Sequence, residues 1–556
     1  MNDRRGATRR LVGAALAACL LAASACGDDD EDSTSSGSDS ESGDSGGETT
    51  TGDLPMSSGL VNVEEADGEP TAGGTLDVAV WFQASSLDPA DGNISGVANG
   101  SALVALYDVL MRWDAETDTF EPQLAESLEA NDDSTEWTLK LRPDVTFSDG
   151  TPLNSEAVVY SINRANEKES PAAVGLIARI ESMDTPDELT VVFHTKEPWV
   201  RFPFVLTNSL GLVVSPTAAE AAGDDFATNP VGAGPFTLER FSDGEELVLT
   251  ARDDYWDGAP NLDEVRFVPV TSGDADRLAG MTSGDFDAGF LRNAGVIADA
   301  LDEGYGGYVE IQNFGELLLM NGRDGRPTAD PRVRSAVALA IDTDDINERV
   351  NQGQGIWSKA MFPESSQWDT SAAAVANTAD AEAATALLDE AKADGYDGSI
   401  SILCDAAADR QTMSITMEAQ LEAVGFDVTI DEKASIGDVV PLVQTEHAYD
   451  LACWGNNTVD AAPLQELDVF FNGPSGYAEG YVDSDAVQEQ LDALALAGDA
   501  DEESAAISAI QDIWTETMPG LPLAAVRELL AWSPQVHGIV PTSATMVILS
   551  DAWVEE

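Results

Sequence analysis

The fold is decided by a stretch that reads Pro122-Gln123-Leu124-Ala125-Glu126-Ser127, then Trp137-Thr138-Leu139-Lys140-Leu141-Arg142, then Val145-Thr146-Phe147-Ser148-Asp149-Gly150-Thr151-Pro152-Leu153. Apolar and polar residues alternate from Trp137 to Leu141, which predicts a strand with one buried face. The pair Asp149-Gly150 that follows is typical of a tight turn. The stretch therefore predicts sheet structure near the beginning of the folded part.

Outward from this stretch, short strands alternate with helices. Thr75–Val80 alternates as a strand, and Asp330-Pro331 gives a helix an N-cap followed by a proline in its first turn. A second helix is expected from Asp380 to Gly395, and a third contains the stripe Met413, Met417, Leu421 and Val424 before Gly425. Because residues 400–453 read β-α-β-(α)-β, the pattern predicts an α/β protein with a separate small sheet there.

The charge of the chain excludes several classes of partner. The 556 residues include 27 Lys and Arg against 101 Asp and Glu, a formal net charge of −74. A protein this acidic is not expected to bind nucleic acid or an anionic membrane surface. Its hydrophobic fraction of 43% is nevertheless that of a folded protein, and its length predicts two or more lobes.

The N-terminus is typical of an exported protein. Four arginines precede an apolar run, Leu11–Ala25, which is short for a membrane span but suits a signal peptide over residues 1–26. The sequence Ala23-Ser24-Ala25-Cys26 resembles the lipidation motif of bacterial lipoproteins, with Cys19 as the alternative lipidated residue. The pair Arg9-Arg10 resembles part of a twin-arginine signal, so both the general and the twin-arginine export routes stay open.

An acidic tether is expected to follow the signal peptide. Residues 27–70 contain fourteen acids, no Lys or Arg, and very few bulky apolar side chains. Such a segment cannot bury enough surface to offset its ordering entropy, so we predict that it is disordered. The expected location is the outer face of the cell membrane, with the protein held there by a lipid anchor.

Motifs along nearly the whole exported part resemble family 5 of the extracytoplasmic solute-binding proteins, the dipeptide, oligopeptide and nickel group that serves ABC transporters. Besides the opening stretch, the matching segments are Gly73–Leu76, Ser86–Pro89, Tyr107–Leu110, Asn229–Phe236, Asp254–Pro260, Asp330–Asp342 and Tyr449–Gly455. The resemblance implies a two-lobed clamshell of the periplasmic-binding-protein type. Lobe one would comprise residues 71–325, with an extra subdomain at about 112–228 and a C-terminal return over 522–556, and lobe two would comprise 326–521.

The resemblance also implies the function. The protein would capture a peptide or another small solute between its lobes and deliver it to ABC permease subunits, as a monomer without catalysis or cofactor. Two alternatives stay open on the residues alone: a secreted hydrolase that uses carboxylates, and a surface adhesion lipoprotein. The sequence shows no G-x-S-x-G, H-E-x-x-H or P-loop motif.

Two cysteines remain in the exported part. Cys404 and Cys453 each end an apolar stretch that is typical of a strand, and an exported protein can form disulfides. A disulfide between them and two buried thiols are both compatible with the sequence. The three histidines are far apart in the chain, and no metal site is expected.

Aromatic and amide side chains that follow strand ends are the candidate ligand-binding residues, because flat rings give contact area at little entropic cost. They are Trp81, Phe82, Gln83, Trp357, Trp454, Asn456, Asn457 and Asp460. Peptide-binding members of the family carry WxADYxDP here, and the first Asp of that motif pairs with the peptide amine. Asn457 stands in its place and cannot form that charge-assisted bond, and Asp460 is the candidate substitute. A neutral solute such as an oligosaccharide therefore stays open beside a peptide.

Overall fold

The computed structural model describes residues 54–64, 68–84, 86–91, 96–114, 117, 119–170, 173–242, 244–374, 378–456, 458–472 and 484–555. Residues 51–556 form one compact unit. The predicted signal peptide with Cys19 and Cys26, most of the predicted tether, and Asn457 lie outside the described residues. Within the described part of the chain, no helix is both long and apolar enough to span a lipid bilayer.

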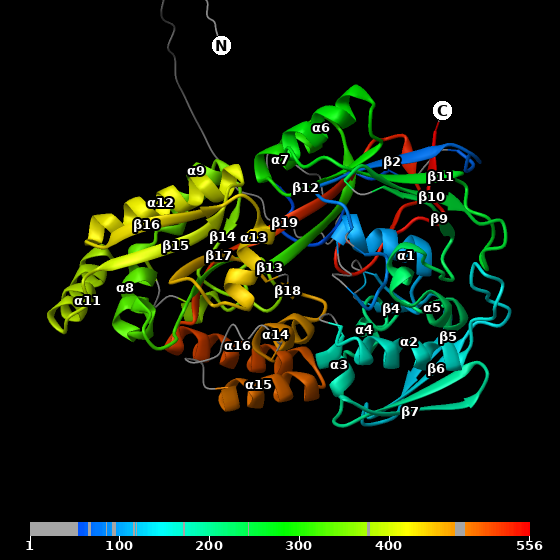
Figure 1. The fold of residues 1–556 in the computed structure, drawn as a ribbon, viewed down its shortest axis with the longest axis horizontal. Helices are drawn as coiled ribbons and strands as arrows, with labels where there is room; N and C mark the ends of the chain where they lie inside the picture. Colours follow the sequence, from blue (N-terminus) through cyan, green and yellow to red (C-terminus); the bar gives the residue numbers. More distant parts are fainter. Residues whose placement is uncertain are drawn as a thin grey trace, which may run out of the picture. The chain divides into compact units, whose positions relative to one another are not determined.

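A large mixed sheet runs through the unit in the order β16-β15-β17-β13-β19-β12-β2-β11-β10-β9 (Figure 1). These strands are β2 Thr75–Val80, β9 Phe236–Ser242, β10 Glu246–Ala251, β11 Glu264–Pro269, β12 Ala288–Leu291, β13 Gly306–Met320, β15 Ser399–Asp405, β16 Asp427–Lys433, β17 Leu451–Trp454 and β19 Gly520–Trp532. Three short strands pair beside this path: β1 Gly59–Val61 and β18 Thr458–Val459 on β13, and β14 Ile356–Trp357 on β19. The predicted first strand over Thr75–Val80 is confirmed.

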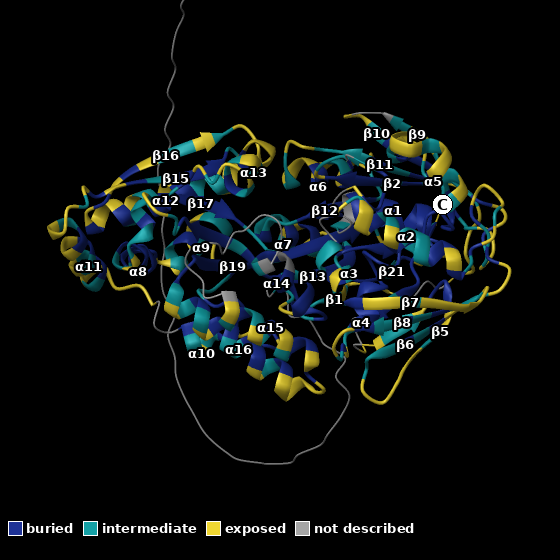
Figure 2. Ribbon diagram, turned by 60° about the horizontal axis from the view of Figure 1, so that its bottom comes forward, coloured by how far each residue is buried: buried dark blue, intermediate teal, exposed yellow. Residues whose placement is uncertain are grey.

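Strands β13 and β19 connect the two ends of the sheet. They are antiparallel and almost wholly buried (Figure 2), with β13 pairing with β17 at Leu317–Met320 and β19 pairing with β12 at Leu529–Trp532. Their register breaks between Gln312 and Glu316, where Phe314 has a φ of 58°. A bulge of this kind bends a strand, so the two crossing strands change direction in the middle of the sheet.

On one side of the crossing strands, parallel pairs join β2 to β11 and to β12. The helices on this side include α1 Ser101–Tyr107, α6 Asp274–Ser283 and α7 Ala294–Asp302. Tyr107, Phe236 and Phe290 are fully buried members of the core under these elements. The C-terminal residues return to this core through β20 Val536–His537, β21 Val540–Pro541, β22 Val547–Ile548 and β23 Trp553–Val554.

On the other side, β15 pairs in parallel with both β16 and β17. The helices there are α8 Pro331–Ala340, α9 Thr343–Asn351, α11 Ala381–Ala393, α12 Ala408–Val424 and α13 Ile436–Gln444. The predicted helix ends of this region are confirmed: Asp330 and Asp380 cap α8 and α11, and Gly425 ends α12 in the left-handed conformation. The separate small sheet predicted over residues 400–453 is wrong, because β17 pairs with β13 and thereby joins β15 and β16 to the large mixed sheet. Met413 and Met417 lie in the core, as their helical spacing indicates.

The opening stretch of the sequence forms a second, antiparallel sheet in the order β5-β6-β8-β7. Its elements and neighbours are β3 Met111–Asp114, β4 Thr119–Pro122, β5 Ala125–Ala130, β6 Glu136–Leu141, α2 Ser155–Glu167, α3 Val174–Ala178, β7 Ile180–Asp187, β8 Thr190–Thr195, α4 Phe202–Val205 and α5 Pro216–Ala222. The strand predicted over Trp137–Leu141 is confirmed, and the side chain of Asp149 accepts a hydrogen bond from Thr151 N in the predicted turn. One hydrophobic cluster joins Phe147 and Phe202 of this region to Trp514 of the last helices, α14 Pro463–Asn472, α15 Ser484–Leu496 and α16 Ala500–Thr517.

The structure corrects the predicted end of the tether. Residues 59–61 form β1, which pairs with β13 from Gly59↔Val309 to Val61↔Gly307, so disorder does not extend to residue 70. Ile311 N donates to Ser58 Oγ at 3.0 Å, and Arg527 Nε donates to Pro55 O at 2.7 Å. Residues 59–61 are ordered because their backbone pairs with β13, a contact that the composition of the segment could not predict.

Candidate functional site

Three predicted site residues follow β2. Trp81 is 38% exposed, and its ring stacks on Phe290 with centroids 5.9 Å apart. Phe82 packs edge-on against Trp81 with centroids 4.8 Å apart. The side chain of Gln83 instead accepts a hydrogen bond from Gly244 N, so it is engaged by the turn between β9 and β10. Trp81 is thus the most exposed of the three side chains.

A second group of predicted residues follows β17. Trp454 ends that strand opposite Leu317, and Asn456 N donates to Phe314 O at 2.9 Å. Gly455 lies so close to β13 that a Cβ atom there would stand 2.2 Å from Gly315 O. A glycine is required at this position because any side chain would push the loop away from the bend of β13. The loop after β17 is therefore held against the bulge of the crossing strands.

Asp460 lies in the same region but is heavily engaged. Its carboxylate accepts hydrogen bonds from Asn313 Nδ2 at 2.6 Å, from Ser366 Oγ at 2.6 Å and from Gln367 N at 3.2 Å. These bonds tie β13 to the loop that contains Ser366. A carboxylate with three donors from its own chain has little capacity left for a ligand amine, and its role in ligand binding stays a prediction.

Trp357 lies on β14, which pairs with β19 at Ala524 and Ala525. The indole is part-buried against the core below α8, and Nε1 has no hydrogen-bond partner among the described residues. Trp357 therefore lies beside β19 where the register with β13 breaks.

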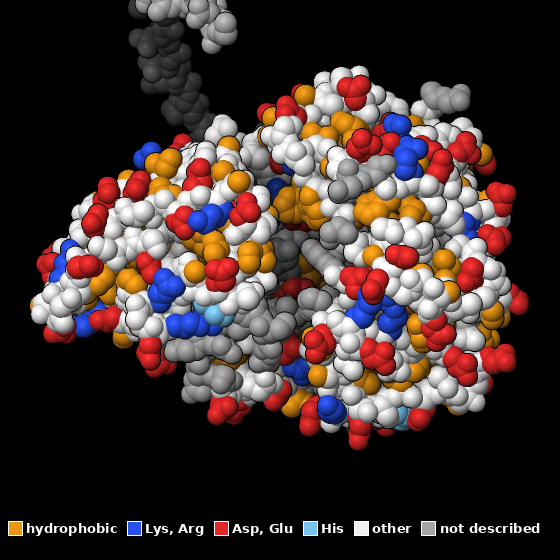
Figure 3. Space-filling model, in the orientation of Figure 1, with side chains coloured by type: hydrophobic (Ala, Val, Ile, Leu, Met, Phe, Trp, Pro, Cys, Tyr) orange, Lys and Arg blue, Asp and Glu red, His pale blue; other side chains and the backbone are white. Residues whose placement is uncertain are grey.

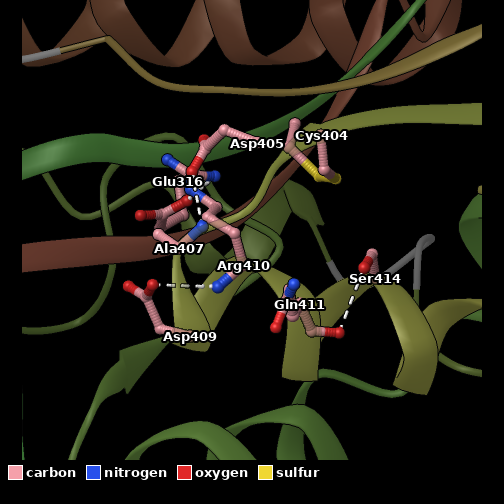
Figure 4. Close-up of a disulfide and its surroundings, with 9 residues drawn as sticks. Glu316, Cys404, Asp405, Ala407, Asp409, Arg410, Gln411 and Ser414 are labelled. Carbon is pink, nitrogen blue, oxygen red and sulfur yellow. Dashed lines mark hydrogen bonds and ion pairs between the residues drawn. A yellow bond between two sulfur atoms is a disulfide. The ribbon is translucent and has the colours of Figure 1, made fainter. Parts of the chain in front are cut away.

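Two buried ion pairs at the crossing strands were not predicted. Glu316 of β13 pairs with Arg410 of α12 (Figure 4), and Glu528 of β19 pairs with Arg292 at 3.2 Å. Burial raises the pKa of Glu316 and of Glu528, and the nearby arginines oppose that rise. The Arg292 guanidinium also lies over the Trp81 ring, 5.5 Å from its centroid. A Glu inside an otherwise apolar strand was the signal that could have revealed both pairs.

The structure joins Cys404 and Cys453 by a disulfide with a Cα–Cα distance of 5.0 Å. The two residues lie at the ends of the neighbouring parallel strands β15 and β17. Figure 4 shows Arg410 and Asp405 beside Cys404, with Arg410 directed toward Glu316. The disulfide therefore fixes the two strand ends from which the loops to Arg410 and to Asn456 begin.

The two ion pairs lie at the crossing strands β13 and β19, with Arg292 on the side of β12 and Arg410 on the side of β15. Figure 3 shows a hollow between the side that contains β15–β17 and the side that contains β2, β11 and β12. An aromatic face, an amide, two arginines and two carboxylates are groups that bind a polar solute by stacking and charge-assisted hydrogen bonds. Trp81 lies beside Arg292, whereas the Trp454 ring packs in the hydrophobic core and Gln83 is held by the turn between β9 and β10. The binding roles of Trp81, Trp454 and Asn456 stay predictions.

Comparisons with known proteins agree with this architecture. Residues 119–477 match the family model described as bacterial extracellular solute-binding proteins, family 5 middle. The probable D,D-dipeptide-binding periplasmic protein DdpA of Escherichia coli K12 is 27% identical over 322 residues, which cover 57% of this chain and 61% of DdpA. The match thus spans about three fifths of that relative's length.

Solved structures share the fold along most of the chain. The periplasmic binding protein DppA of Helicobacter pylori, in complex with the peptide STSA, superposes with a TM-score of 0.74 at 22% identity over 87% of this chain and 99% of that one. AgaA of A. tumefacien R10, in complex with agropinic acid, gives 0.71 at 24% identity over 87% and 99%. The mixed α/β fold is that of the periplasmic binding proteins, and the chain belongs to family 5 of the bacterial extracellular solute-binding proteins.

Proposed function

We propose that the protein is the extracytoplasmic substrate-binding component of an ABC importer. The proposal rests on the arrangement at β13 and β19. Arg292, from one side of the sheet, pairs with Glu528, and Arg410, from the other side, pairs with Glu316. Lobe one would comprise residues 71–325 and 522–556 with the subdomain at 112–228, and lobe two residues 326–521. A bend in two shared strands is a suitable hinge for closure around a solute.

The solute is a peptide or another small polar molecule. DdpA is named for a D,D-dipeptide, while DppA and AgaA were solved with a peptide and with agropinic acid. One fold therefore holds different solutes, and the side chains at the crossing strands decide among them. The comparisons give no support to a hydrolase or an adhesin.

The remaining features of the proposal concern the membrane. Residues 1–26 act as a signal peptide, Cys26 carries the lipid anchor, and the acidic segment spaces the folded unit from the membrane. The closed protein, a monomer without catalytic activity, docks on the permease subunits. Growth with a radioactive fatty acid tests the lipid anchor. We expect the wild type and Cys19→Ser to carry the label and Cys26→Ser to lack it.

A thermal-shift screen across peptides, sugars and metal chelates tests the receptor function. A solute at 100 times its dissociation constant adds about 2.7 kcal/mol to the free energy of unfolding. We expect one class to raise the melting temperature, and Arg410→Gln to weaken that response. Arg349→Gln, on the exposed face of α9, is the matched control because its side chain is 58% exposed. A response that is equal in both variants, or no response to any class, would count against a receptor site at the crossing strands.

A further inference from the structure

Strand β15 is paired unequally with its two neighbours. It pairs with β16 along its whole length, from Ser399 to Asp405, but with β17 only at Ile402 and Leu403. Parallel pairing is slightly less stable per residue than antiparallel pairing, so a junction this short needs further support. Since β17 pairs with β13, the junction of β15 with β17 is where β15 and β16 join the crossing strands.

Side chains close this junction at both of its ends. At the first end, the Asp450 carboxylate accepts hydrogen bonds from Ser401 N at 3.0 Å and from Ser401 Oγ at 2.7 Å. At the second end, one residue beyond the last pair of each strand, Cys404 and Cys453 form the disulfide, with a Cα–Cα distance of 5.0 Å. One end is therefore held by hydrogen bonds, and the other by a covalent bond that a reductant breaks.

The end that the disulfide closes also carries an ion pair. Beyond Cys404 the chain enters α12, whose Arg410 pairs with Glu316 of β13 (Figure 4). Glu316 immediately precedes the residues of β13 that pair with β17. Because α12 follows β15 and Glu316 lies beside β17, the ion pair spans the junction between these two strands. The disulfide and the ion pair therefore hold the same end of the junction.

Reduction of this disulfide requires the junction to open. Cys404 and Cys453 are each 1% exposed, and they lie in a hydrophobic core with Met417 and Leu451. Thiol–disulfide exchange needs direct attack on a sulfur atom, which this core excludes. A reductant therefore reaches the sulfur atoms through local opening, and the rate of reduction measures how often the junction opens.

We propose that the Cys404–Cys453 disulfide is a redox-sensitive clasp that keeps β15 beside β17 and thereby keeps Arg410 on Glu316. A dithiol reductant supplies two electrons and two protons: the S–S bond breaks, two thiols form, and the reductant becomes a cyclic disulfide. Reduction then leaves the second end of the junction to the ion pair alone. Weaker solute binding by the reduced protein would follow, a consequence that rests on the proposed receptor function, whereas the clasp itself acts without a solute.

The reciprocity of coupled interactions gives the first test. If the disulfide holds Arg410 on Glu316, that ion pair must equally hold the junction closed against reduction. We expect Arg410→Gln to speed the reduction of the disulfide by dithiothreitol by about tenfold or more, as measured by alkylation and mass spectrometry of the peptides that contain Cys404 and Cys453. Arg201→Gln is the matched control, because it breaks the buried ion pair with Glu503 of α16, outside the sheet. It should leave the rate within about twofold of the wild type.

Hydrogen exchange locates the opening. In the reduced wild type, residues 404–411 should exchange about tenfold faster or more, while residues 427–433 of β16 should be unchanged. The double variant Cys404→Ala/Cys453→Ala should show the same exchange without reductant and should not respond to dithiothreitol. The reduced wild type carries the test if the double variant does not fold.

Three outcomes would overturn the clasp. Equal reduction rates in Arg410→Gln and the wild type would show that the ion pair and the disulfide are not coupled. Faster reduction in Arg201→Gln as well, or exchange that accelerates equally at residues 404–411 and in β16, would mean that the disulfide contributes to global stability alone. Peptides with Cys404 and Cys453 that are not linked in the unreduced protein would remove its basis. None of these outcomes changes the receptor function, which the thermal-shift screen tests separately.

Discussion

At the scale of single residues, the acids of the crossing strands are the least expected feature. Glu310 of β13 stands opposite Glu528 of β19, and Thr545 Oγ1 lies 2.7 Å from one carboxylate and 2.8 Å from the other. A hydroxyl has only one proton to donate, so one of the two carboxyl groups must be protonated. Glu528 is paired with Arg292 and accepts from Gln312 Nε2 at 2.8 Å, which leaves Glu310 as the protonated acid.

The pH dependence of stability tests this assignment. Burial raises the pKa of Glu310 from 4.5 to about 8, with a further contribution from the charge of Glu528. Because the folded state holds a proton that the unfolded state releases, Glu310 makes stability fall as pH rises from about 4.5 to about 8. Between these two pH values, Glu310 lowers the free energy of unfolding by at most about 1.4 kcal/mol per pH unit.

We expect Glu310→Gln to make the fall in stability with pH less steep and to be more stable than the wild type above pH 6, because Glu316 and Glu528 still contribute to the fall. Urea unfolding between pH 5 and 8.5 measures both effects. The exposed Glu516→Gln is the control and should follow the wild type. An unchanged slope in Glu310→Gln would show that Glu310 is ionised in the folded protein.

At the scale of helices and strands, local signals predicted much of the fold. The caps at Asp330 and Asp380 and the glycine after α12 lie where the sequence indicated, because these signals act over a few residues. The crossing strands escaped prediction. Strand β13 is buried on both faces and contains Glu310 and Glu316, so it has neither the alternation of a surface strand nor a purely apolar run.

Strand β1 shows how a short segment gains structure from tertiary contacts. Arg527 is buried, and burial lowers its pKa to about 10. Its guanidinium donates to Pro55 O at 2.7 Å and to Gln354 O at 3.3 Å, so one side chain joins the segment before β1 to the loop after α9. A bond between residues 472 positions apart is invisible to any local pattern.

We expect Arg527→Met to release the segment that contains β1. The variant leaves Pro55 O and Gln354 O without this donor, a loss of about 1–3 kcal/mol. Hydrogen exchange of residues 54–61 should accelerate by about tenfold or more, since about 1.4 kcal/mol corresponds to a factor of ten. Arg240→Met, at a side chain that is 48% exposed, is the control. Unchanged exchange at β1 would mean that backbone pairing with β13 suffices to hold it.

At the scale of the whole molecule, the candidate site was only partly predictable. The aromatic and amide residues Trp81, Trp454 and Asn456 were proposed because they follow strand ends, and their contact with a ligand stays a prediction. Arg292, Glu316 and Arg410 were missed because their proximity depends on three elements distant in sequence. Acidic side chains are scattered over the visible face (Figure 3), whereas Glu310 of β13 and Glu528 of β19 are buried.

Two ion pairs hold the antiparallel-sheet region against the last helices. Arg179 pairs with Asp468 of α14, and Arg201 binds Glu503 of α16 through two bonds of 3.0 and 3.2 Å. Arg201 and Glu503 are 302 positions apart, and they connect the proposed subdomain of lobe one with proposed lobe two. The pairs lie beside the hydrophobic cluster that already joins the two regions.

We expect Arg201→Gln to destabilise the protein by about 2 kcal/mol, less than the ~3–5 kcal/mol of a fully buried pair because the Arg201 side chain is 21% exposed. The double variant with Glu503→Gln should recover part of the loss, because it no longer leaves Glu503 buried and unpaired. Arg349→Gln removes the surface pair with Asp345 and should cost at most about 0.5 kcal/mol. Urea unfolding measures all three. If the double variant is no more stable than Arg201→Gln, Glu503 carries no penalty when unpaired, and the shared hydrophobic cluster holds the two regions together instead.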